Sequence, residues 1–173
     1  MKNFDEVLAA AFQDTDLSVS DIPNLDLYMD QILTLFDEGL AANKRRPEDK
    51  LLTKTMVNNY SKERLIMPLK GKKYSREQLM QLLCILNLKQ NLTLTDIKTL
   101  TAHENGALNF QAAYETSLAL KTRLRERLPE LLQTELSSTA DLTDREKTLA
   151  LTLALSAGAT YLRRACEQII DRQ

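Results

Sequence analysis

The sequence predicts a mainly helical protein that carries one small β-hairpin. The 173 residues include only four Gly and four Pro, and 5% are aromatic, with no Trp. A β-sandwich or barrel needs more turns and more aromatic pairs than this composition supplies. Leu, Ala, Glu, Lys and Gln, which favour helices, are abundant instead. A chain of this length can bury a hydrophobic core as about one domain, without disulfide staples.

Residues 1–50 predict a short helix, a longer amphipathic helix and a loop. Residues 4–13 carry a weak helical pattern. After Asn24, which is a good N-cap residue, apolar side chains recur every three or four positions and predict one buried helix face. This apolar stripe consists of Leu25, Tyr28, Met29, Ile32, Leu33, Leu35, Phe36 and Leu40. Residues 44–49 are charged and contain a Pro, and we expect them to form a loop.

A short helix with one polar face is predicted behind Thr53, its expected N-cap. The core-facing side of this helix consists of Met56, Val57 and Tyr60. The opposite side consists of Lys54, Thr55, Asn58, Asn59 and Lys62. Pro68 ends this part of the chain. Residues 69–74 then form a Gly-centred turn with three lysines, and such a turn between short extended arms suits a small hairpin.

Two capping boxes mark the helices that follow. Ser75 and Gln78 start a helix that is apolar on nearly all sides, and such a helix belongs at the centre of a domain. Thr93 and Asp96 start another helix, which the Asn-Gly pair at 105–106 is expected to end. The sequence thus places a central buried helix directly after the lysine-rich turn.

The C-terminal part predicts two long helices joined by a linker. An amphipathic helix begins at about Asn109, and Pro129 is expected to kink or break it. Residues 137–140 have the small polar composition of a linker. Thr143 opens a third capping box. The apolar run over residues 149–162 is too short to span a membrane, which takes about 20 residues, and it predicts a buried helix.

The chemistry-bearing residues exclude several classes of site. His103 is the single His, and Cys84 and Cys166 are the two Cys. No spacing matches a Cys/His zinc site or a Gly-rich nucleotide loop, and no carboxylate lies in a motif with a base. We therefore expect no enzyme activity, no catalytic residue, no metal and no cofactor. The N-terminus lacks a signal peptide, and both Cys are expected to be buried reduced thiols of a cytoplasmic protein.

Opposite charges are concentrated in two neighbouring segments. Residues 1–43 contain one basic and nine acidic residues, for a net charge of −8. Residues 44–76 contain eleven basic and three acidic residues, for a net charge of +8. The whole chain has a net charge of −1, so the basic segment stands out as the electrostatic footprint of a polyanionic partner. A basic solvated surface without a partner is the alternative.

Four motifs resemble the winged helix-turn-helix core of MerR-type transcription regulators. TKTMVNNY at 53–60 resembles that family's recognition helix, and LIMP at 65–68 resembles its Leu-x-x-Pro element. Tyr74 and Ser75 resemble the exit from its wing, and TLTDIKTL at 93–100 resembles a later helix of the same core. The order and the spacing of the four motifs agree with the family. The resemblance implies a helix that enters the DNA major groove.

Residues 22–100 resemble even more closely a family known as domain of unknown function 1836, which is found mainly in Gram-positive bacteria. The features that carry this resemblance are the acidic first helix, the recognition-helix motif and the KKYS sequence at 72–75. Three residues depart from the MerR pattern: Asn58 stands in place of an Arg, Asn59 in place of an aromatic residue, and Arg64 in place of a Gly. The base preference of MerR-type proteins is therefore not carried over to this chain.

Together these features predict a bacterial DNA-binding transcriptional regulator with three parts. Residues 1–21 form an acidic N-terminal segment, and residues 22–106 form a MerR-like winged helix-turn-helix domain. Residues 107–173 form a C-terminal helical region for dimerisation or sensing, or one that completes a monomeric core. The recognition helix covers about 53–61, and the wing covers about 68–74.

The predicted partner is double-stranded DNA. The candidates for base or backbone contacts are Lys54, Thr55, Asn58 and Asn59. The candidates for phosphate contacts are Lys62, Arg64, Lys70, Lys72, Lys73 and Arg76. The alternative function is a non-enzymatic adaptor whose basic face binds an acidic protein partner. In that case the acidic residues 1–21 cover the basic face, within the chain or in a second molecule.

Overall fold

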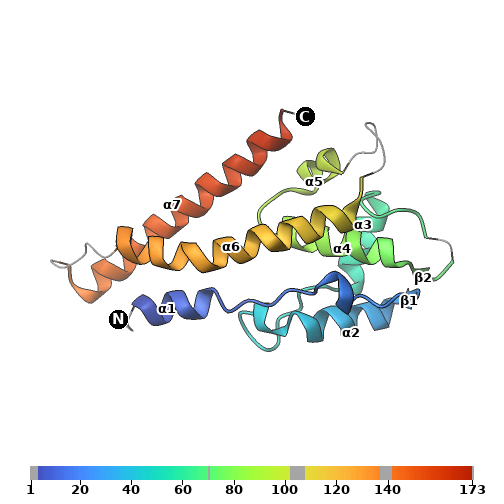
Figure 1. The fold of residues 1–173 in the computed structure, drawn as a ribbon, viewed down its shortest axis with the longest axis horizontal. Coiled ribbons are helices and arrows are strands. Elements are labelled where there is room, and N and C mark those ends of the chain that lie inside the picture. Colours follow the sequence, from blue (N-terminus) through green and yellow to red (C-terminus); the bar gives the residue numbers. More distant parts are fainter. Residues whose placement is uncertain (1–3, 70, 102–107, 137–141, 173) are drawn as a thin grey trace. The chain divides into compact units, whose positions relative to one another are not determined.

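The computed structural model describes residues 4–69, 71–101, 108–136 and 142–172 (Figure 1). These residues divide between two compact units. The core unit covers residues 14–119, and the helical unit combines residues 1–13 with residues 120–173. The predicted mainly helical fold class, with one small antiparallel pair of strands, is confirmed. The predicted stop at 105–106, His103 and the linker at 137–140 lie outside the described residues.

The core unit contains one two-stranded sheet surrounded by helices. Its elements in chain order are η1 (Val19–Asp21), β1 (Leu27–Tyr28), α2 (Met29–Gly39), η2 (Ala41–Asn43), α3 (Lys54–Lys62), β2 (Lys73–Tyr74), α4 (Arg76–Leu88), α5 (Leu94–Leu100) and the first part of α6 (Phe110–Leu136). Strands β1 and β2 are antiparallel, with Leu27 opposite Tyr74 and Tyr28 opposite Lys73. We expected the partner of β2 to be an adjacent arm of a local hairpin. Within the described residues, the partner is β1, which precedes α2.

Helix α2 begins later than predicted, and the prediction of Asn24 as its N-cap is wrong. Leu27 and Tyr28 pair with β2, so their backbone is extended and the helix starts only at Met29. Leu25 and Tyr28, which we expected in the buried stripe, are 58% and 49% exposed. The later turns of the predicted stripe are confirmed, because its members at Ile32 and Phe36 are fully buried.

Helix α4 lies at the centre of the core unit, as predicted. The buried apolar side chains of this helix are Leu79, Met80, Leu82, Leu83, Ile85 and Leu86. Four other predicted N-caps are confirmed. The hydroxyl oxygens of Thr53, Ser75, Thr93 and Thr143 each accept a hydrogen bond from the backbone N–H three residues later. Local capping chemistry therefore fixes where these helices begin.

An N-terminal strap, residues 14–22, is part of the core unit. The Thr15 N–H donates to Oδ1 of Asn43 at 2.7 Å, and the Asn43 side chain donates to the Thr15 carbonyl at 2.8 Å. The hydroxyl of Tyr114 donates to the Leu17 carbonyl at 2.8 Å. Gly39 permits a close approach of the strap, because a Cβ there would lie 2.4 Å from Cδ2 of Leu17. The compact unit thus extends beyond residues 22–106 on both sides.

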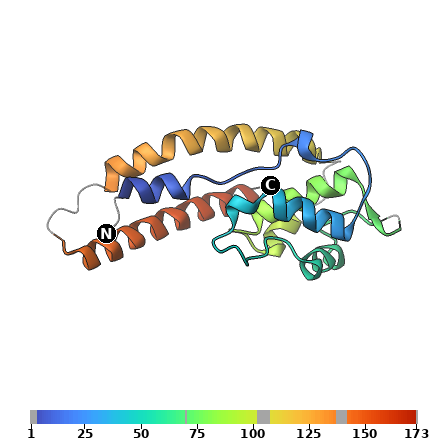
Figure 2. The ribbon, with the colours of Figure 1, turned by 90° about the horizontal axis from the view of Figure 1, so that it is seen from below.

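The helical unit contains α1 (Phe4–Ala11), the later part of α6 and α7 (Asp144–Ile170). Helix α1 runs alongside the C-terminal part of α6 in both views (Figure 1; Figure 2). Pro129 lies inside α6 and does not break it. Proline removes one backbone donor, and the strong helix formers on both sides of it keep the remaining turns helical.

The prediction of a buried helix over residues 149–162 is wrong for most of its side chains. Leu151 is buried, but Leu149 and Leu153 are more than 60% exposed, and so is Leu162. A helix that is apolar on nearly all sides needs neighbours on every side. Among the described side chains of α7, only Leu151 and Ile170 are buried. Among the helices of the described segments, none has the length and the hydropathy of a membrane span.

Candidate nucleic-acid interface

Helix α3 presents one continuous polar face to solvent. Val57 is fully buried and Tyr60 is 3% exposed, and these two side chains fix the rotation of the helix. The five residues predicted for the polar side are all exposed: Lys54, Thr55, Asn58, Asn59 and Lys62. The structure therefore brings these five predicted residues together on one face, with ammonium, amide and hydroxyl groups pointing outward from a rigid element.

The end of α3 places Arg64 in a strained backbone conformation. The Arg64 N–H donates to the Ser61 carbonyl at 3.1 Å, and the Leu65 N–H donates to the Tyr60 carbonyl at 2.9 Å. This pair of bonds is a Schellman motif, whose left-handed position usually holds Gly. Arg64 occupies that position with φ of 59°. Its exposed cationic side chain therefore extends from the same end of α3 as Lys62.

The Arg64→Gly substitution is expected to raise the free energy of unfolding by about 1 kcal/mol, because Gly adopts a left-handed backbone without the strain of a Cβ. The free energy of unfolding in urea measures this change. Arg45→Gly is a matched control, since Arg45 is also exposed but its φ is not positive. Equal effects of the two substitutions would contradict the assignment of strain to Arg64.

The wing ends at Tyr74, whose side chain is buried in the core unit. Lys72 and Lys73 are exposed, and Gly71 has φ of 92°, which allows the chain to turn before β2. Tyr74 is 4% exposed; burial raises the pKa of its hydroxyl, and the Ser61 hydroxyl on α3 opposes that rise. The two groups fall short of hydrogen-bond geometry, and the buried Ser61 Oγ has no partner among the described residues. The predicted phosphate contact at Lys70 lies outside the described residues.

Two buried glutamines of α4 hold the backbone that leads into the wing. Oε1 of Gln81, which is 1% exposed, accepts a hydrogen bond from the Met67 N–H at 2.8 Å. Nε2 of Gln78 donates to the Met67 carbonyl at 2.9 Å and to the Pro68 carbonyl at 3.2 Å. Sequence reasoning used Gln78 only as a cap and missed Gln81. The available signal was a pair of amides spaced by three residues inside an apolar helix.

Arg76 is not part of the exposed face. Its guanidinium donates to the carbonyls of Val19 and Ile22, at 2.7 and 2.9 Å, and the side chain is half-buried. These bonds tie the N-terminal strap to the start of α4. The role of Arg76 in phosphate contact stays a prediction, while the structure gives this residue a structural role.

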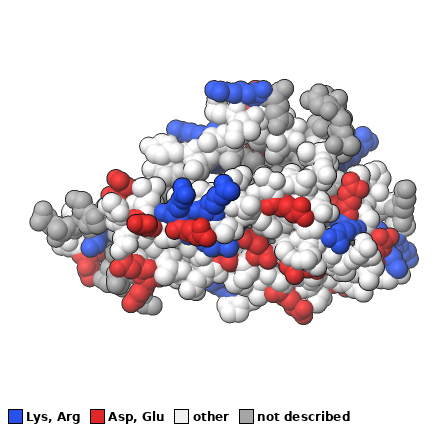
Figure 3. All heavy atoms as spheres, viewed as in Figure 1, with Lys and Arg blue, Asp and Glu red and all other residues white. Residues whose placement is uncertain are grey.

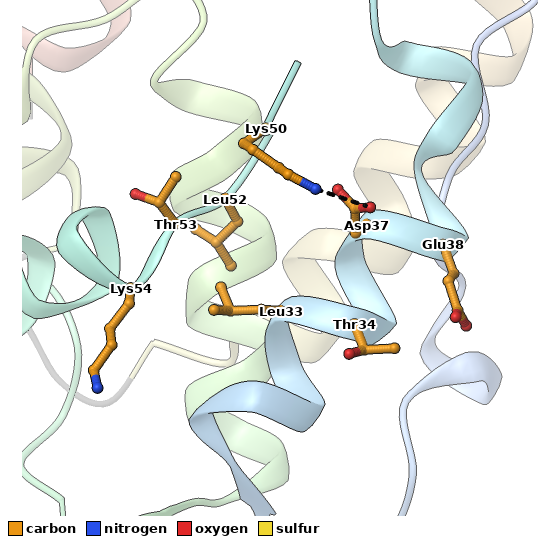
Figure 4. A pocket seen from close by; sticks show the side chains of 8 residues that line it. All are labelled: Leu33, Thr34, Asp37, Glu38, Lys50, Leu52, Thr53 and Lys54. Atoms are coloured by element: carbon orange, nitrogen blue, oxygen red, sulfur yellow. Dashed lines mark ion pairs between the residues drawn. The ribbon is translucent and has the colours of Figure 1, made fainter. Parts of the chain in front are cut away.

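Part of the basic segment is neutralised within the core unit. Nζ of Lys44 lies 2.8 Å from Asp37, and Nζ of Lys50 lies 3.6 Å from the same carboxylate. Contact with Lys44 lowers the pKa of Asp37. Beside this cluster an open hollow of about 360 Å³ separates the end of α2 from the start of α3 (Figure 4). Carboxylates and lysines mix along its wall, so it favours neither an anion nor a cation.

The N-terminal strap does not cover the polar face of α3. Its hydrogen bonds go to Asn43, Gly39, Arg76 and Tyr114. Asp21 accepts hydrogen bonds from Ser18, which lower the pKa of its carboxyl. The face of the molecule shown in Figure 3 carries both basic and acidic side chains. The polar face of α3 is thus exposed in the described structure, and its masking by the acidic residues 1–21 stays a prediction.

The described part of the chain contains two free thiols, and they differ in burial. Cys84 is half-buried, and burial raises the pKa of its thiol to about 11. Cys166 is exposed, so the expectation of a buried thiol is wrong there, and most other side chains of α7 are not buried either. No group of three His, Cys, Asp or Glu side chains within the described residues could hold a metal ion.

Comparison with known proteins links the core unit to one family. The family model described as "Domain of unknown function (DUF1836)" matches residues 17–117. No curated protein and no solved structure matches the chain. The matched span coincides closely with the core unit, residues 14–119, which carries the strap, α3 and the wing.

Proposed function

Since the chain belongs to the DUF1836 family, whose description assigns no activity, we propose a function from the site itself. We propose that the protein is a cytoplasmic, non-enzymatic transcriptional regulator that binds double-stranded DNA through a MerR-like winged helix-turn-helix core. The observation that carries this proposal is the polar face of α3. The face combines exposed lysines with adjacent asparagines on a helix whose rotation is fixed by buried Val57 and Tyr60.

The chemistry of this face suits a DNA major groove. Asparagine pairs with the edge of adenine through two hydrogen bonds, and lysine contacts guanine or phosphate. Asn58 and Asn59 are therefore the groups that read bases, with Lys54 and Thr55 at the start of the helix beside them. Buried Tyr74 and Gln81 hold the wing against the same core. Lys72 and Lys73 can then contact the phosphates that flank the groove.

The order of elements supports the MerR-like form of the proposal. Helix α2 precedes α3, β2 follows α3, and α4 and α5 complete the core. In helix-turn-helix proteins the second helix enters the groove and the first crosses the backbone. Here residues 40–53 separate the two helices, which is longer than the usual short turn. Lys44 in this connection pairs with Asp37 of α2 and so ties the connection back to that helix.

Binding to duplex fragments across a salt series tests the proposal. If Lys62, Arg64 and the three wing lysines neutralise five phosphates, the logarithm of the binding constant falls against the logarithm of salt with a slope near −4.5. The triple variant Lys62/Lys72/Lys73→Ala is expected to make that slope shallower by about 3. A matched control removes three exposed charges elsewhere, through Lys98/Arg164/Arg172→Ala.

Two outcomes contradict the proposal. The folded wild-type protein could fail to bind any duplex at low salt, which would exclude direct DNA binding by this form. The two triple variants could also weaken binding equally, which would show an effect of net charge alone. Binding of an acidic protein in place of a duplex would favour the adaptor function, which uses the same lysines but does not need Asn58 and Asn59.

A further inference from the structure

Tyr28 lies on the surface beside the wing, although its spacing predicts a place in the core. Its side chain is 49% exposed. Its backbone is fixed from two sides, by the antiparallel pairing with Lys73 and by a 2.9 Å hydrogen bond from the Tyr28 N–H to Oε1 of Gln31. An exposed aromatic side chain on such a rigid backbone can act on its neighbours with a defined geometry.

The neighbour of the Tyr28 ring is the ammonium group of Lys73. Nζ of Lys73 lies 4.8 Å from the centroid of the ring. The face of an aromatic ring attracts a cation at this distance. A free surface lysine samples many rotamers, and ordering them opposes binding. Lys72 is also exposed but has no such ring contact among the described residues. The wing therefore carries one ordered lysine next to one without this support.

We propose that Tyr28 is a positioning residue of the DNA interface, whose ring holds the Lys73 ammonium in place to receive a phosphate of the duplex. This inference rests on the proposed function. The ring takes up one side of the ammonium group, and the N–H donors on the other side stay free to bind phosphate oxygen. Tyr28 acts through Lys73, so its contribution to affinity disappears when Lys73 is absent.

The first measurement needs no DNA. The ring current of Tyr28 is expected to shift the side-chain methylene protons of Lys73 upfield in the NMR spectrum of the full chain. Tyr28→Phe keeps the ring and the shift, whereas Tyr28→Leu removes both. Lys72 serves as the internal control, because its protons stay unshifted in all three proteins. An unshifted Lys73 in the wild type would overturn the pairing on which the inference depends.

The second measurement is a double-mutant cycle on a duplex fragment that the wild type retains at low salt. Tyr28→Leu is expected to weaken binding about two- to fivefold, and Tyr28→Phe is expected to restore it. In the Lys73→Ala background, Tyr28→Leu is expected to cause no further loss. If the two losses multiply instead, Tyr28 acts independently of Lys73 and the positioning role is overturned.

Failure of the proposed function gives a different result. If the wild type binds no duplex while the Lys73 shift persists, the ring–lysine pair exists but the DNA-binding function and the positioning role both fall. If the wild type binds but the Lys73 shift is absent, the proposed function stands and only the role of Tyr28 falls. A urea unfolding curve for Tyr28→Leu shows whether a weaker complex reflects loss of the folded core.

Discussion

The double variant Leu149→Glu/Leu153→Glu is expected to abolish the self-association that we propose for the chain, because these two exposed leucines lie one turn apart on α7. Ten of the thirteen exposed large apolar side chains within the described residues belong to the helical unit. They are Val7, Leu120, Leu124, Leu131, Leu142, Leu149, Leu153, Tyr161, Leu162 and Ile169. Exposed apolar side chains in this number are typical of a unit that a partner covers. We propose that the occupant is a second copy, because a DNA-binding unit gains specificity when a dimer contacts two half-sites.

The size of the expected effect follows from the cost of burying charge. Burial of one leucine contributes about 1.5–3 kcal/mol, and a symmetric interface contains each leucine twice. An unpaired carboxylate at the same place costs several kcal/mol more. Sedimentation equilibrium measures the oligomeric state. Gln133→Glu/Gln168→Glu adds the same charge at exposed polar positions of the helical unit and is expected to leave association intact. A monomeric wild type would contradict the dimer.

The second large effect is expected when the side-chain amide of Gln81, which holds the backbone leading into the wing, is removed. Gln81→Leu is expected to lower the free energy of unfolding by about 1–3 kcal/mol, because the buried N–H of Met67 loses its acceptor. The leucine has similar size, so lost packing contributes little. Urea unfolding measures the change. Gln111→Leu, at an exposed position of α6, is the control. Hydrogen exchange at Met67 is expected to accelerate in the same variant.

Unchanged exchange at Met67 in the Gln81→Leu variant would contradict the role assigned to Gln81. The Gln81 side chain would then fill space in the core without holding the Met67 backbone. The same experiment separates stability from function. Gln81 is buried and binds the Met67 backbone, so we expect any loss of DNA affinity in this variant to arise through displacement of the wing.

Local patterns predicted the part of the site that lies on α3. The rotation of α3 follows from the spacing of Val57 and Tyr60, and its start follows from the Thr53 cap. Both signals act within a few residues, and sequence reasoning can detect them. The five residues of the polar face are therefore found together where the sequence placed them. The DNA-binding role of these residues stays a prediction.

The remainder of the site depends on contacts between distant segments. The exposure of Tyr28 results from pairing between β1 and β2, and no local pattern specifies that register. Gln81 looks like a polar interruption of an apolar helix until the Met67 backbone is placed beside it. The exposure of Leu153 depends on what covers α7, and periodicity along one chain does not specify a second chain.

The contrast between the two thiols makes the protein suitable for selective chemical labelling. Burial raises the pKa of Cys84 to about 11, so little of its reactive thiolate forms at neutral pH, while Cys166 is exposed on α7. A maleimide dye therefore attaches to the helical unit and leaves the α3 face unmodified. Cys166 lies one turn from the exposed Leu162 on α7, so the dye is expected to hinder the proposed association of two copies, while the salt dependence of DNA binding is measured on the same sample.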